Sequence, residues 1–312
     1  MRAIRVLAPI FLCTLIFASH AAGQDTGPQT PIVAPPNLML LVHQEIQFGK
    51  GNARQRLEVA AARAADRYSV PYSWFDLQSL TGPREALTLS PFDSFDHLEQ
   101  AFVGWNQIYA AHADLARLRD QMDELVAGED AVIAIRRNDL GYRVSDIDLA
   151  SARFLRVIEV HVLPGHESDF TEGAKILSDA YEKARVDTPW AVYQVKMGMQ
   201  SSNFIILMPM TFLKQNDDLI LSEEDMQNAE GEEGEKRMQQ IVREAYAGTT
   251  NNLYAITIET SHLAKELTPA DSASGTSTAP DASKNAATGE TSMPTGVPDP
   301  AADSTPKTSG KN

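Results

Sequence analysis

Cysteine is nearly absent from this chain of 312 residues. Its one cysteine, Cys13, lies in an apolar stretch, residues 6–17, that follows two arginines and precedes several small residues. This pattern is typical of a secretory signal, and it predicts cleavage near residues 21–23. Removal of residues 1–23 leaves a chain without cysteine, which excludes disulfides, thiolate nucleophiles and cysteine-ligated metals. We therefore expect an exported protein, either periplasmic or secreted.

Positive charge is also scarce. The sequence has 27 Lys and Arg against 42 Asp and Glu, a formal net charge of -15. Nucleic acids and anionic membrane surfaces select basic proteins, so neither is an expected partner. Beyond residue 23 no apolar run is long enough to span a bilayer, and we expect no transmembrane anchor in the mature chain. Glycine-rich phosphate loops, serine nucleophile elbows and zinc-protease helix motifs are missing as well.

The sequence does contain an order of elements that occurs twice. Residues 24–37 show no periodicity and predict a flexible lead-in. Hydrophobic periodicity over residues 38–140 predicts the order β-α-β-β-α-β, and the same order follows over residues 152–263. The predicted strands are 38–48, 73–80, 85–90, 131–135, 154–163, 190–197, 204–208 and 252–258. The predicted helices are 53–68, a region within 95–127, 169–184, and 223–246 with a break near Gly231.

Similar residues recur 116 positions apart in the two halves. This offset relates Trp74 to Trp190, and an offset lengthened by two positions relates Pro91 to Pro209. Shared element order and shared turn positions indicate an internal duplication, and therefore a monomeric pseudo-dimer.

The C-terminal segment, residues 266–312, differs from the rest in composition. Small, polar and proline residues dominate it, and aromatic residues vanish. Such a segment cannot bury enough apolar surface to offset the entropy lost on ordering, so we expect a disordered tail.

Two consecutive βαββαβ units, with the turn 163–166 before a helix, resemble the dimeric α+β barrel superfamily, in particular its antibiotic-biosynthesis-monooxygenase-like proteins. The resemblance covers residues 38–263. It implies an α+β fold in which two ferredoxin-like repeats form one single-chain barrel. That superfamily includes cofactor-free oxygenases, haem enzymes such as chlorite dismutase, isomerases and proteins without known activity, so function does not follow from the fold.

A histidine–glutamate pair marks the first strand of each half. His43 and Glu45 are two residues apart, as are Glu159 and His161, so each pair lies on one face of its strand. The residues that alternate with the second pair are apolar and should meet helices. The two pairs are then expected to face the interior of the barrel.

The second strand of each half carries a further polar set. Trp74, Asp76 and Gln78 alternate with Phe75 and Leu77, which predicts that the polar set also faces inward. The predicted lumen is therefore polar. Its candidate ligand-binding residues are His43, Glu45, Trp74, Asp76, Gln78, Glu159, His161, Trp190 and Gln194.

Several chemistries remain open for this lumen. His43, Glu45, Glu159 and His161 are candidate ligands for zinc, manganese or non-haem iron, although the sequence requires no cofactor. A His–Glu pair could also act as an oriented general base, or the pairs could satisfy each other structurally. Three functions are compatible with these patterns: a non-catalytic barrel that binds a small molecule or serves as a scaffold, a cofactor-free or metal-assisted oxygenase or isomerase, and a protein-interaction module.

Overall fold

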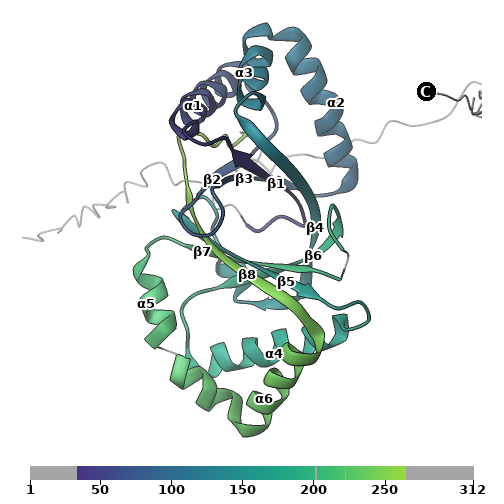
Figure 1. Cartoon of the computed structure of the whole chain (residues 1–312), viewed down its shortest axis with the longest axis vertical. Helices are drawn as coiled ribbons and strands as arrows, with labels where there is room; N and C mark the ends of the chain where they lie inside the picture. Colours follow the sequence, from purple (N-terminus) through teal and green to yellow (C-terminus); the bar gives the residue numbers. More distant parts are fainter. Residues whose placement is uncertain (1–33, 201, 222, 265–312) are drawn as a thin grey trace, which may run out of the picture. The chain divides into compact units, whose positions relative to one another are not determined.

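The computed structural model describes residues 34–264 except 201 and 222 (Figure 1). The expected signal sequence, most of the lead-in and the expected tail lie outside the described residues. Within them the fold is α+β, and eight strands form one closed antiparallel barrel in the order β1-β3-β2-β8-β5-β7-β6-β4. No helix in this part of the chain is both long and apolar enough to cross a bilayer.

The first half of the barrel has the strand order β4-β1-β3-β2. Its elements are β1 (Leu38–Ile46), α1 (Gly51–Tyr68), β2 (Phe75–Ser79), β3 (Glu85–Phe92), α2 (Phe95–Ala111), α3 (Ala113–Asp123) and β4 (Val126–Tyr142). Ser94 is the N-cap of α2, and its hydroxyl accepts a hydrogen bond of 3.2 Å from the His97 N–H. Figure 1 shows α1, α2 and α3 beside these strands.

The second half has the strand order β8-β5-β7-β6, which repeats the first. Its elements are β5 (Phe154–Val162), α4 (Glu167–Ala184), β6 (Trp190–Met197), β7 (Phe204–Met210), α5 (Lys214–Leu221), α6 (Glu223–Ala245) and β8 (Tyr246–Ile256). The predicted break in the last helix is present, because Gly231 has φ 72° and ψ 168°.

Helices α1 and α4 end in the same way. Ser69 and Arg185 follow their last residues in the left-handed conformation, with φ of 52° and 57°. A proline follows each, Pro71 and Pro189, and cannot continue a helix. The two helices therefore end at equivalent positions of the two halves, and the chain returns from there to the sheet.

The β-ladders of the two halves also share one register. Matching cross-strand pairs are Leu41 and Leu89 with Val157 and Leu207, and Asp76 and Thr88 with Val192 and Ile206. These correspondences follow the offset of 116 on the first strand of each pair and 118 on the second. Equivalent positions can therefore be compared residue by residue.

Apolar side chains from all eight strands fill the barrel interior. They include Leu41, Phe75, Leu89, Val132, Val157, Tyr193, Leu207 and Tyr254. An eight-stranded barrel is only wide enough for side chains to fill it. The prediction of a polar lumen is therefore wrong.

The outer face of the second half is packed tightly against its helices. Phe170 of α4 stacks on Phe204 of β7, with ring centroids 3.8 Å apart, and both are buried. Trp190 and Val192 of β6 belong to the same cluster. Trp190 is thus on the helix side, and the expectation that it faces the lumen is wrong. Gln194 alternates with the interior residues Tyr193 and Val195, so it also lies on the outer side.

Candidate functional site

The two His–Glu pairs meet only in part. His43 and Glu159 lie on the interior side predicted for them, where His43 Nε2 is 3.6 Å from a Glu159 carboxylate oxygen. The other ring nitrogen, Nδ1, is 3.4 Å from a carboxylate oxygen of Glu85. Tyr254 of β8 donates a hydrogen bond to the second oxygen of Glu85. This group of four side chains connects strands of both halves.

Opposing effects set the charges in this group. Burial disfavours the charged form of His43, but the hydrogen bond to Glu85 and the charges of Glu85 and Glu159 outweigh it and raise the His43 pKa. Burial likewise favours the neutral form of Glu85, yet its bonds to His43 and Tyr254 hold its pKa below the ordinary value. His43 thus lies between two carboxylates that favour its charged form and links the halves, although its Nε2 has no hydrogen-bond partner among the described residues.

The four predicted metal ligands do not come together. Glu45 is exposed to solvent, and His161 Nδ1 is 3.1 Å from the side-chain amide nitrogen of Asn203. The residues that the structure describes contain no group of three or more His, Cys, Asp or Glu side chains placed to hold a metal ion.

Trp74, Asp76 and Gln78 lie on the outer face of β2 and not in the lumen as predicted. Phe75 and Leu77, which alternate with them, belong to the interior cluster. The prediction was wrong because apolar side chains fill the interior, while the first half's helices leave polar residues room on the other face.

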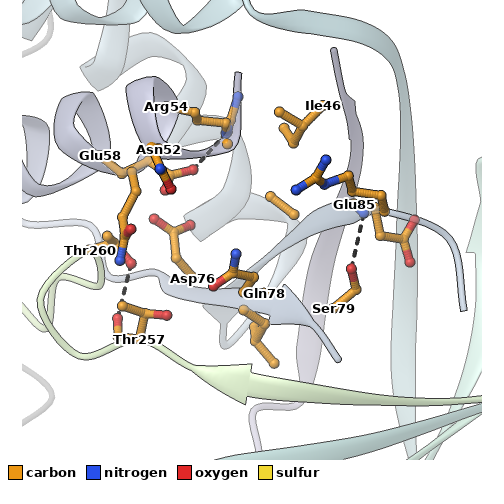
Figure 2. A pocket seen from close by; sticks show the side chains of 15 residues that line it. Ile46, Asn52, Arg54, Glu58, Asp76, Gln78, Ser79, Glu85, Thr257 and Thr260 are labelled. Atoms are coloured by element: carbon orange, nitrogen blue, oxygen red, sulfur yellow. Dashed lines mark hydrogen bonds and ion pairs between the residues drawn. The ribbon is translucent and has the colours of Figure 1, made fainter. Parts of the chain in front are cut away.

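Asp76 extends from β2 toward α1 (Figure 2). It is half-buried, and the Thr88 hydroxyl donates a hydrogen bond of 2.8 Å to its carboxylate. Burial, with a further contribution from the charge of Glu58, raises the Asp76 pKa to about 7, against the opposing effects of Thr88 and Arg54. A carboxyl group that titrates near neutrality is a frequent feature of functional sites.

Two cavities adjoin at Asp76. The first, drawn in Figure 2, has a volume of about 180 Å³ and a mainly polar lining that includes Gln78 and Thr257. Arg54 and Glu58 of α1 line this cavity and the second one, as Asp76 does. These three charged side chains therefore stand where the two spaces meet.

The second cavity, of about 230 Å³, has an aromatic wall. The ring centroid of Trp105 lies 5.8 Å from that of Trp74 and 5.3 Å from that of Tyr109. The Arg119 guanidinium covers Tyr109 at 4.5 Å from the ring centroid. We call the site formed by Arg54, Glu58, Asp76, Trp74 and Trp105 the outer-face site.

Arg54 is fixed inside this site. Arg54 as a whole is only 6% exposed, although arginine is seldom buried. Its Nε donates to Glu58 at 2.6 Å, and its Nη2 donates to the side-chain oxygen of Gln44. Its Nη1 is buried, and no acceptor for it exists among the described residues. A buried donor without an acceptor is rare in folded proteins and requires an explanation.

In the second half, the equivalent layer between the sheet and its helices is an apolar core. At the equivalent positions Arg54, Glu58, Asp76, Thr88 and Ser90 are replaced by Phe170, Ala174, Val192, Ile206 and Met208. Charged groups are costly in such a layer, whereas the second half packs it with apolar side chains. Sequence reasoning missed Arg54, Glu58 and Trp105, but this polar-for-apolar difference at the offset of 116 was available to find the first two.

No family model matches the chain, and no curated protein matches it in sequence. Similar solved structures include an anthrone oxidase-like protein (13% identity, 72% of this chain and 93% of that chain, TM-score 0.49). A chlorite dismutase variant from Candidatus Nitrospira defluvii in complex with cyanide is also similar (8% identity, 72% of this chain and 92% of that chain, TM-score 0.44). So is a candidate monooxygenase from Lactobacillus acidophilus (5% identity, 72% of this chain and 95% of that chain, TM-score 0.45). Similarity at this level concerns the course of the chain, and shared chemistry does not follow from it.

Proposed function

We propose that this protein is an exported barrel that binds a small molecule in the outer-face site. The observation that carries the proposal is the set of charged residues, Arg54, Glu58 and Asp76, in a layer whose counterpart is apolar. Ligand sites combine an apolar, often aromatic wall with a few placed polar groups, and the two cavities together have this character.

The fold gives this proposal its context. We propose that residues 38–140 and 152–263 are duplicated ferredoxin-like repeats and that the chain is a monomeric pseudo-dimer. The matching strand orders and registers of the halves support this interpretation. The interior then serves closure and stability, and the ligand is bound in one repeat only.

A second candidate function is catalysis at the same site, as in the oxygenase or isomerase hypothesis. The observations in its favour are that Asp76 lines both cavities and that its pKa is about 7, since a general base works best when its pKa is near the operating pH. In this case Asp76 would accept a proton from the bound molecule.

The binding proposal is tested by filling the outer-face site with the residue of its counterpart. The Asp76→Val variant copies Val192, and Asp179→Asn on the exposed surface of α4 is the control. Thermal unfolding is measured with indole, 1-naphthol, anthranilate and 2-naphthoate. A probe at 100 times its dissociation constant should stabilise the native chain and the control by about 2.7 kcal/mol.

Loss of that stabilisation in Asp76→Val supports the proposal. Equal stabilisation of both variants places the bound probe elsewhere, and a native chain that no probe stabilises contradicts the proposal. Mass spectrometry of a bound probe separates the two functions, because consumption of the probe that depends on Asp76 indicates catalysis.

A further inference from the structure

Arg54, which borders the outer-face site, has one guanidinium nitrogen without an acceptor among the described residues. Glu58 and Gln44 hold two of its nitrogens, and this fixes the direction of the third, Nη1. Nη1 is buried without an acceptor among the described residues, and Arg54 borders both cavities. A ligand oxygen is the partner that this nitrogen needs, because a guanidinium can only donate.

Asp76 limits which chemical groups a ligand of this site can carry. In its neutral form the carboxyl group carries a proton that can be donated to a second ligand oxygen. An ammonium ligand would leave Nη1 without an acceptor and would be repelled by Arg54. A group with two acceptor oxygens uses both donors, and hydrogen bonds that involve charged partners are the stronger ones.

We propose that the outer-face site binds a planar aromatic carboxylate, with its ring against Trp74 and Trp105 and its carboxylate accepting a hydrogen bond from Arg54 Nη1. This inference rests on the proposed function, since it names the ligand class of the same site. Aromatic rings of Trp offer a planar ligand offset or edge-to-face contacts, which supplies the apolar part of the recognition.

The charges around the site predict a proton linkage. The charged groups that line the cavities with Asp76 come from α1 (Arg54 and Glu58), α3 (Arg119 and Asp123), the first residue of β3 (Glu85) and the residue before it (Arg84). Three of these groups are basic and three are acidic, so ionisation of Asp76 adds one uncompensated negative charge. Binding of a carboxylate should then require neutral Asp76 and weaken as the pH rises through 7.

Calorimetric titration of the full chain tests the ligand class. The probes are 2-naphthoate and its neutral amide, 2-naphthamide, each at pH 6 and pH 8.5. We expect 2-naphthoate to bind at least tenfold more tightly than 2-naphthamide at pH 6. Its dissociation constant should rise by about 30-fold at pH 8.5 if only neutral Asp76 accepts it, while that of the amide changes little.

Variants then assign the carboxylate contact. Arg54→Lys keeps the charge but lacks the forked donors of arginine. It should weaken the binding of 2-naphthoate at least tenfold and leave the affinity for 2-naphthamide unchanged. Equal affinity of the two probes for the native chain overturns the ligand class while the proposed function stands. Failure of all aromatic probes overturns both. The comparison of probes needs no variant, so it remains decisive even if Arg54→Lys does not fold.

Discussion

Replacing Asp76 by Asn should make the protein more stable, and increasingly so as the pH rises. Asn has nearly the same shape, and its side-chain oxygen can still accept the hydrogen bond from Thr88. What the substitution removes is the titrating proton of a half-buried carboxyl group. The prediction therefore isolates the electrostatic cost of this residue.

The magnitude follows from the difference in pKa between the two states. The Asp76 pKa is about 7 in the folded chain and 3.8 ordinarily. Below pH 3.8 the carboxyl group is neutral in both states and costs nothing. Above that pH the unfolded chain releases the proton first, so stability falls as the pH rises and the full cost, about 4 kcal/mol, is present above pH 7. Between pH 5 and pH 8 the cost grows by about 2–3 kcal/mol.

Urea unfolding of native chain and variant at pH 5 and pH 8 measures this difference. The free energy of unfolding of Asp76→Asn minus that of the native chain should be larger at pH 8 by about 2–3 kcal/mol. Asp179→Asn, an exposed substitution on α4, should show no such change. An Asp76→Asn difference that is the same at both pH values would refute the raised pKa of Asp76 in the folded chain.

Two further predictions concern the rest of the fold. Because the carboxylates of Glu85 and Glu159 raise the pKa of His43, its charged form stabilises the fold below pH 6.5, and that contribution is lost as the pH rises through the folded pKa. His43→Gln should therefore lower the free energy of unfolding more at pH 5.5 than at pH 9, and a loss independent of pH would contradict the charged cluster. Phe170→Ala removes a buried ring stacked on Phe204 and should cost about 3–5 kcal/mol in urea unfolding; a loss below 1 kcal/mol would show that this layer is not tightly packed.

The sequence predicted most of the secondary structure because its turn signals are strong. The first strand and helix of each half agree with the structure to within two residues. The extent of β4 was missed, since polar residues such as Glu129, Asp130 and Asn138 interrupt its apolar pattern. These residues are exposed, and Glu129 and Asp130 are held in the strand by pairing with β1 and not by burial. The division of the helical region into α2 and α3 near His112, and helix α5, were not predicted.

The site was harder to predict because alternation along a strand separates two faces without saying which is which. Asp76 and Phe75 were assigned to the wrong sides on the assumption that polar residues line the lumen. In a closed barrel covered by helices, both faces of every strand are potential cores, and the filling of the interior decides the assignment. Arg54 could not be recognised from its own helix, because a charged residue there usually faces solvent.

The continuous connection between the halves has a consequence for how such a site could arise. In a barrel made from two identical chains, any substitution appears twice, so an arginine at position 54 would also stand where Phe170 now holds the second core together. Here the two positions are separate in one sequence, and each can be selected alone. One half can keep an apolar layer beneath its helices while the other accommodates charged side chains there, and the cost in stability falls on one layer instead of two.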